Sequence, residues 1–184
     1  MRRIALISLL CLGLTGGAAA AQEGLSFESF KASRTDPIEV NSDRLELLQA
    51  EQKAVFRGTV VATQGELTMR AAALALSYNP DPDKQRGEGP ISRVEATGRV
   101  TLVSKTESAE ADHMIYLVDR GLIKLTGNVE LVYSGNTLNG ETLVIDLVSG
   151  LSRIEGGPQN QGRVRAVFNP QSLEETPQPE KATP

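Results

Sequence analysis

The chain has one cysteine, one histidine and no tryptophan among its 184 residues, and aromatic residues make up only 4% of it. The cysteine is Cys11, which lies in the N-terminal leader described below, so the rest of the chain lacks a disulfide framework and a cysteine-based metal site. His113 is the only residue that could complete a Ser-His-Asp triad, and neither a Gly-x-Ser-x-Gly elbow nor a glycine-rich phosphate loop is present. We therefore predict no metal, no cofactor and no catalysis.

Long apolar runs are absent after residue 21. Residues 1–21 combine Arg2-Arg3, an apolar stretch from Ile4 to Leu14 and a small-residue stretch that ends at Ala21. This order is typical of a secretory signal peptide cleaved near Ala21, and it predicts a soluble product exported to the periplasm. Without the leader the chain has 19 − 2 = 17 basic and 23 acidic residues, a charge of −6, which argues against nucleic acid as a partner.

What the sequence does contain is a repeated Gly-x-Val motif. It begins at Gly58, Gly98 and Gly127, and Gly156 marks a degraded copy 29 residues after Gly127 (156 − 127). The longer spacing between the first two copies is explained by a loop rich in proline and glycine at 79–89, inserted between two units. A fixed period of about 29 residues indicates a fold built from repeated units.

Apolar and polar residues alternate on both sides of each motif, as in Ile123 and Leu125 before Gly127 and Val129 and Leu131 after it. A period of two with one apolar face predicts half-buried β-strands. The alternation changes phase once in each unit, across 70–71, 110–111 and 139–140, and such a change requires a bend or a bulge. We predict that each unit consists of two strands joined at a corner, and that two sheets face each other.

Acidic residues recur where we expect one strand of each unit to open, at Asp43, Asp112 and Glu141. Paired carboxylates can perform glycoside chemistry, so a carbohydrate-active β-solenoid enzyme is one alternative. A structural role at the corner fits better, because an active site is normally singular whereas these acids repeat. A purely structural adhesin is a further alternative. We expect His113 to lie on the mixed, outward face of its strand.

The chain divides into four parts. After the leader we expect a flexible segment at 22–36, one β domain at 37–170 and a disordered tail rich in proline and glutamate at 171–184. Many inward positions of the β domain hold alanine or glycine, and large aromatic residues are scarce. A lightly filled interior of this kind is what a groove for a flexible apolar ligand needs.

Four segments of the chain resemble the OstA-like family: PIEVNSD at 37–43, FRGTVVATQG at 56–65, ADHMIY at 111–116 and LTGNVEL at 125–131. The resemblance covers residues 36–170 and is strongest to the periplasmic bridge proteins of lipopolysaccharide transport. It implies an incompletely closed, twisted antiparallel β-jellyroll that holds the acyl chains of lipopolysaccharide inside. It also implies head-to-tail self-association through edge strands.

The partners that the resemblance implies are lipopolysaccharide, an OstA-like anchor component in the inner membrane and a barrel translocon in the outer membrane. Another OstA-like component of the same pathway is the second possibility. A cleavable leader and the end of the sequence at residue 184 argue against both the anchored component and the barrel-linked domain.

Inward positions of the alternation, including those that match the family, are the predicted lipid contacts. They are Ile38, Val40, Leu45, Leu47, Phe56, Val60, Met69, Leu74, Leu76, Leu102, Met114, Tyr116, Val118, Leu125, Leu131, Leu143 and Ile145.

Overall fold

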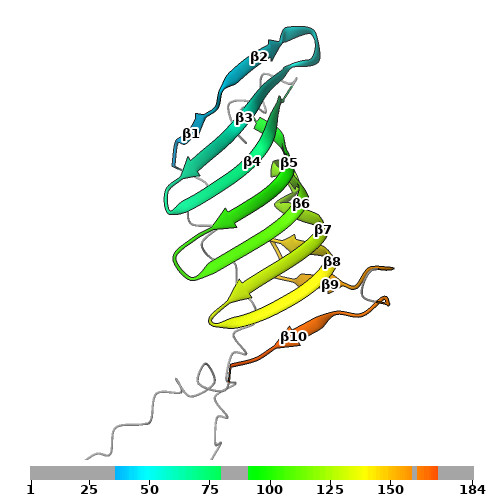
Figure 1. The fold of residues 1–184 in the computed structure, drawn as a ribbon. Helices are drawn as coiled ribbons and strands as arrows, with labels where there is room; N and C mark the ends of the chain where they lie inside the picture. The colour runs from blue at the N-terminus through cyan, green and yellow to red at the C-terminus, as the bar shows by residue number, and fades with distance from the viewer. Residues whose placement is uncertain (1–35, 80–90, 159–160, 170–184) are drawn as a thin grey trace, which may run out of the picture.

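The structure, a computed structural model, describes residues 36–79, 91–158 and 161–169 and is built almost entirely from β-strands (Figure 1). All strand pairings in this part of the chain are antiparallel. Its elements in chain order are β1 (Ile38–Asn41), β2 (Arg44–Leu48), the 3-10 helix η2 (Gln49–Glu51), β3 (Lys53–Gln64), β4 (Leu67–Tyr78), β5 (Ile91–Val103), β6 (Glu107–Leu117), the 3-10 helix η3 (Val118–Arg120), β7 (Leu122–Tyr133), β8 (Asn136–Asp146), β9 (Ser152–Glu155) and β10 (Arg165–Val167).

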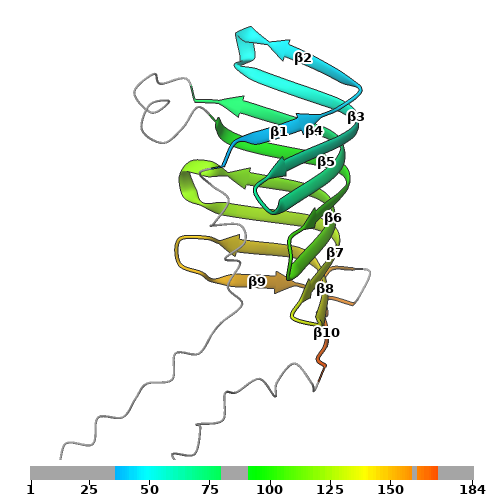
Figure 2. The same cartoon turned by 90° about the vertical axis from the view of Figure 1, so that its left-hand side faces the viewer.

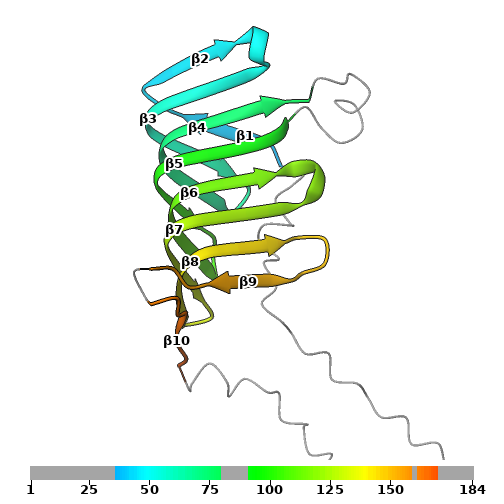
Figure 3. The same cartoon turned by 90° about the vertical axis from the view of Figure 1, so that its right-hand side faces the viewer.

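Strands β3 to β8 follow one another as neighbours in one ten-stranded sheet. Tight turns join several of them, and the turn between β7 and β8 uses Ser134 and Gly135, both with positive φ (47° and 76°), as a two-residue hairpin requires. At one end of the sheet β1 and β2 both pair with β3, and at the other end β9 and β10 both pair with β8. Figures 2 and 3 show these pairs of edge strands diverging, so the sheet divides in two at each end.

Glycine bulges fold the sheet in two. The register between β3 and β4 shifts between Arg57 and Val60, where Gly58 (φ 75°) and Thr59 (φ 40°) oppose a single residue of β4. The same shift follows Gly98 in β5 and Gly127 in β7. An extra residue in one strand bends the β-ladder and increases its twist. Because the bulge recurs in alternate strands, the bends of neighbouring strands are aligned.

The bends define two facing parts of the sheet. The β1 half contains β1, β10 and residues 60–71, 100–111 and 129–140. The β2 half contains β2, β9 and residues 53–57, 73–78, 91–97, 113–126 and 142–146. An open, twisted antiparallel sheet of this kind confirms the all-β fold class that we predicted.

Three details of the prediction were wrong. A single folded sheet replaces the two separate sheets, because each long strand continues through its bend. The change of phase lies after Ala71 rather than across 70–71, since the next buried residue is Leu74, and Ala111 and Met114 repeat this step. Asp112 and Glu141 lie in the middle of β6 and β8 instead of opening strands. The reason is that the extra residue belongs to the partner strand, so the alternation in β4 restarts opposite the bulge.

Two of the recurring acids, Asp43 and Asp112, pack against bulge glycines. A Cβ atom placed on Gly58 would collide with the carboxylate of Asp43, and one placed on Gly127 would lie 2.5 Å from Oδ2 of Asp112. Asn128 Nδ2 also donates a hydrogen bond to Asp112 Oδ2, at 2.8 Å. These contacts support the structural role for the acids and show why glycine is required at the bend.

The hydrophobic core lies between the two halves. Its largest fully buried side chains are Leu74, Leu125, Leu131, Leu143, Ile145, Val60, Val100 and Val129. They come from both halves, so each strand contributes apolar side chains on both sides of its bend. Among the residues that the structure describes, no helix is long and apolar enough to cross a membrane.

An apolar groove between the two halves of the sheet

A groove of about 510 Å³ lies between the β1 half and the β2 half. Most of its walls come from β1, β3, β4, β5 and β6, near the end of the sheet at which β1 and β2 diverge. Its lining residues are Asp36, Pro37, Ile38, Ala62, Thr63, Gln64, Leu67, Met69, Leu74, Leu76, Ile91, Val94, Leu102, Met114, Tyr116, Val118, Ile123 and Leu147.

The groove exists because side chains of different size face one another across the sheet. Ala62 is a small residue in its wall, and Met69 and Met114 are unbranched side chains that adapt to an irregular space. Leu125 and Leu143, further along the sheet, are 0% and 1% exposed and fill the space between the halves. This groove therefore lies toward the β1 end of the sheet, away from Leu125 and Leu143.

The walls of the groove carry little charge. Asp36 is the only charged residue that lines it within the described part of the chain. Thr63 and Gln64 add polar groups, and Gln64 Nε2 donates a hydrogen bond to the backbone oxygen of Asp36 at 2.9 Å, which ties the start of β1 to β3. A space with apolar walls and a few polar groups suits the alkyl part of an amphipathic molecule.

Eight of the predicted lipid contacts line this groove: Ile38, Met69, Leu74, Leu76, Leu102, Met114, Tyr116 and Val118. Five others, Val60, Leu125, Leu131, Leu143 and Ile145, are buried in the core. Val40 and Phe56 pack half-buried against that core. Leu45 and Leu47 lie outside the groove on edge strand β2, 50% and 64% exposed. Lipid contact by any of these residues stays a prediction.

Our list of lipid contacts missed several lining residues, notably Ala62, Val94, Ile123, Ile91 and Leu147. Ala62, Val94, Ile123 and Leu147 occupy inward positions of the alternation, so the pattern contained a signal for them. Ile91 is the first residue of β5, beside a loop, where the alternation stops. Only the folding of the sheet brings the Ile91 side chain to the groove.

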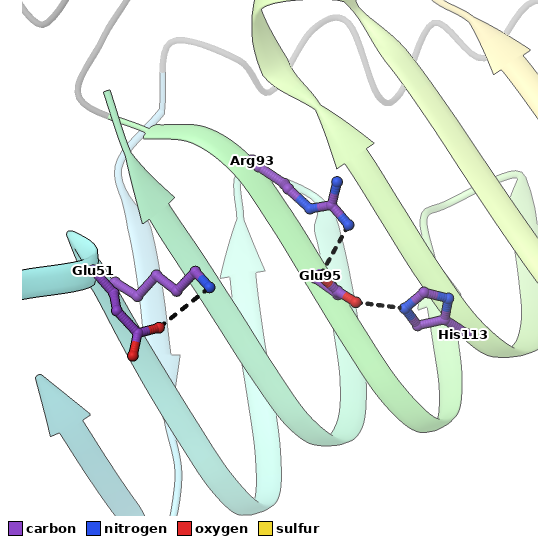
Figure 4. A network of polar contacts seen from close by, with 5 residues as sticks. Glu51, Arg93, Glu95 and His113 are labelled. Atoms are coloured by element: carbon purple, nitrogen blue, oxygen red, sulfur yellow. Dashed lines mark hydrogen bonds and ion pairs between the residues drawn. The ribbon is translucent and has the colours of Figure 1, made fainter. Parts of the chain in front are cut away.

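A polar network lies outside the groove, on the outer face of the β2 half (Figure 4). His113 Nε2 is 3.0 Å from Glu95 Oε1, and Arg93 Nη2 is 3.0 Å from Glu95 Oε2. Burial by itself raises the pKa of Glu95, but hydrogen bonds from His113 and Arg93 and the charge of Arg93 outweigh it, so the pKa lies below its usual value. Figure 4 also shows Glu51 in its separate ion pair with Lys53. His113 thus has a structural partner on the outward face, where we expected it.

The recurring acids lie outside the groove, because none of Asp43, Asp112 and Glu141 lines it. In the parts of the chain that the structure describes, no three His, Cys, Asp or Glu side chains come together in a way that could hold a metal ion. The arrangement is suited to binding an apolar ligand.

Comparison with known proteins identifies the family. Residues 39–151 match the family described as LptA/(LptD N-terminal domain) LPS transport protein. The chain belongs to this family. The match runs from within β1 to the turn before β9 and includes every lining residue of the groove except Asp36, Pro37 and Ile38.

Two relatives align with most of the chain. An uncharacterised protein of Rhizobium meliloti strain 1021 is 29% identical over 162 residues, which cover 86% of each chain. The lipopolysaccharide export system protein LptH of Pseudomonas aeruginosa is 28% identical over 142 residues, which cover 73% of this chain and 77% of LptH.

A crystal structure of the P. aeruginosa LptH has the same fold. That structure is described as the LptA-homologous periplasmic component of the conserved lipopolysaccharide transport device. It superposes with a TM-score of 0.63 at 23% identity, and the match covers 75% of this chain and 99% of the other. The open, folded sheet is therefore a fold that this family of transport proteins uses.

Proposed function

We propose that this chain is a periplasmic lipopolysaccharide-binding bridge protein. It holds the acyl chains of lipopolysaccharide in the groove between the β1 half and the β2 half, and it performs no catalysis. Its partners are an inner-membrane OstA-like anchor component and an outer-membrane barrel translocon. The observation that carries the proposal is an apolar groove of about 510 Å³ in a member of a lipopolysaccharide transport family.

The composition of the groove is consistent with this cargo. Each acyl methylene group transferred from water to an apolar environment contributes about 0.8 kcal/mol, so a few methylene groups are enough to drive loading. Since Asp36 is the one charged residue in the described lining, no strong ionic anchor holds the lipid at one point. A carrier that must pass its cargo onward needs enough affinity to load the lipid and no single contact strong enough to retain it.

The ends of the sheet are suited to head-to-tail self-association. Both ends present short edge strands, and an unpaired edge can accept the strand of another chain. In the β1 half the two ends differ in charge: Asp36 and Glu39 are the ionizable residues of segment 36–41, whereas Arg163 and Arg165 are those of segment 161–169. Pairing β10 of one copy with β1 of the next would bring these opposite charges together and continue the groove past exposed Ile38.

The proposal is tested by photo-crosslinking in the living cell. A photoreactive residue replaces Tyr116, whose side chain lines the groove, and the matched control replaces Glu130 on the exposed outer face of β7. We expect a lipopolysaccharide adduct from position 116 and none from position 130. Adducts from neither position, in protein that is folded and exported, would contradict the proposal.

Lipid binding also separates the proposal from the enzymatic alternative. An enzyme that used the recurring acids would lose turnover when Asp112 or Glu141 is replaced by its amide. We expect these variants to retain lipid binding, because neither residue lines the groove. Loss of an activity toward carbohydrate in them would favour the enzyme.

A further inference from the structure

The β2 half has an unpaired edge at each end of the sheet (Figure 3). In the part of the chain that the structure describes, β2 pairs only with β3, and β9 pairs only with β8. The outer edges of both strands therefore carry backbone N–H and C=O groups with which a further strand can pair. Leu45 and Leu47 face inward on β2 but are 50% and 64% exposed, because no strand lies beyond them in the described part of the chain. Exposed apolar side chains beside one another commonly mark a contact with another molecule.

The strand directions allow one copy of the chain to continue the sheet of another. Seven antiparallel pairings lead from β2 to β9, so the two edge strands run in opposite directions. The next copy, placed in the same orientation, therefore presents its β2 antiparallel to β9. Paired residues also form unbroken rows across the β2 half, from Leu45 to Ile154 on the inner face and from Glu46 to Arg153 on the outer face. A copy stacked in line thus meets its neighbour row by row.

The two edges are complementary in this register. The pairs across the junction, with the residue of β2 first, are Arg44 and Glu155, Leu45 and Ile154, Glu46 and Arg153, and Leu47 and Ser152. Both outward pairs join opposite charges, and both inward pairs cover an exposed leucine. Opposite charges directly across an antiparallel pair stabilise it, whereas like charges destabilise it.

The charges also disfavour the neighbouring registers. A shift of two residues is the smallest that keeps the apolar side chains on the inner face. In one direction it places Arg44 opposite Arg153, and in the other it places Glu46 opposite Glu155. Arg57 Nε lies 3.9 Å from Glu46 Oε2, but the Glu46 side chain is still 42% exposed and is accessible to a second copy. The charge pattern of the two edges therefore specifies one register.

We propose that β9 of one copy pairs with β2 of the next, in the register set by the pairs Arg44–Glu155 and Glu46–Arg153. This inference rests on the proposed function and adds a second seam to the contact between β10 and β1. The occupant of the β2 edge is a second copy of this chain, because the charges of β9, read in the opposite direction, complement those of β2. With both seams, both halves of the sheet continue from copy to copy, and an acyl chain stays between two apolar walls at the junction.

The first test is charge reversal with rescue. Sedimentation velocity measures the Kd of self-association for the exported chain without its leader and for Glu46→Arg, Arg153→Glu and the double variant. Each single variant places like charges across the seam and should raise this Kd by about two- to thirtyfold, whereas the double variant should restore it. The matched control is Lys124→Glu, which reverses an exposed charge of the same outward row on the interior strand β7 and should keep the wild-type Kd.

The second test reads the register directly. Without its leader the chain has no cysteine, so introduced cysteines can be paired selectively. Ser152→Cys is mixed under oxidising conditions either with Leu47→Cys, its partner in the proposed register, or with Leu45→Cys, which is two residues out of register. Directly opposed residues of an antiparallel pair are close enough for a disulfide. We expect a disulfide between positions 152 and 47 and little between 152 and 45.

Other outcomes would overturn the seam. These are a wild-type Kd in both single variants, a double variant without rescue, or preferential crosslinking of position 45. A disulfide between two copies of Ser152→Cys would assign β9 to a tail-to-tail contact and would overturn it as well. A wild-type chain that stays monomeric yet binds lipopolysaccharide would refute the seam and leave lipid binding intact. A chain that forms the seam but does not bind lipopolysaccharide would refute the proposed function alone.

Discussion

Replacing Ile38 tests the groove with little risk to the fold. Ile38 lines the groove from edge strand β1 and is 42% exposed, so this part of its surface is free to contact a lipid. Full burial of an isoleucine side chain contributes about 1.5–3 kcal/mol, and the exposed share corresponds to about 0.6–1.3 kcal/mol. Ile38→Ala should therefore raise the Kd for lipopolysaccharide by about three- to ninefold.

The assay is equilibrium titration of the purified protein with lipopolysaccharide, monitored by fluorescence or calorimetry. Leu48→Ala is the matched control, because Leu48 is 37% exposed on edge strand β2, does not line the groove and is not among the predicted lipid contacts. Ile38→Asp should weaken binding further, since a carboxylate would be desolvated against an alkyl chain. Equal effects of the Ile38→Ala and Leu48→Ala variants, or none in Ile38→Asp, would refute the groove as the lipid site.

Three other predictions concern stability and assembly. Thr59 is a β-branched residue with φ 40°, a conformation that asparagine adopts with less strain. Thr59→Asn should therefore raise the free energy of unfolding by about 1 kcal/mol in urea titrations. An unchanged urea midpoint would argue against backbone strain at the bulge. Glu95 has a lowered pKa in the folded state, so its ionised form stabilises the protein above the unfolded pKa of 4.5, and this contribution is lost as the pH falls through the folded pKa. Glu95→Gln should therefore flatten the loss of thermal stability below pH 4.5. An unchanged dependence of thermal stability on acid pH would contradict a stabilising role for the contacts of Glu95 with His113 and Arg93. Replacing Arg163 and Arg165 with glutamate should shift sedimentation toward the monomer, while persistent multimers would show that charge does not direct the contact.

Much of the strand pattern could be predicted from the sequence, because alternation of apolar and polar residues directly reflects the geometry of a strand. The recurrence of glycine at 58, 98 and 127 defined the repeat, but our prediction placed the bends elsewhere in each unit, and the structure shows that these glycines form the bulges, with positive φ and no room for a Cβ atom. Our predicted position for the phase change in β4 was wrong by about two residues. Its cause lies in the partner strand β3, and a single strand pattern does not contain that information.

The lining of the groove was less predictable. Alternation assigned Leu74 and Leu125 to the same inward face, yet Leu74 contributes to the groove and Leu125 lies outside its lining in the packed core. The distance between the two halves at each point decides between these outcomes. That distance depends on twist and on side chains from strands far apart in the sequence, which no local pattern reports.

The sequence alone determined most of the strand pattern, which face of each strand is apolar, that the chain must bend once in each unit and which family it resembles. All of these follow from local rules of backbone geometry and side-chain alternation. Tertiary structure alone decided that one folded sheet encloses a groove at the β1 end and that Val148 and Leu151 remain exposed beside it. These features arise because side chains brought together from separate strands either fill the space between the halves or leave part of it open.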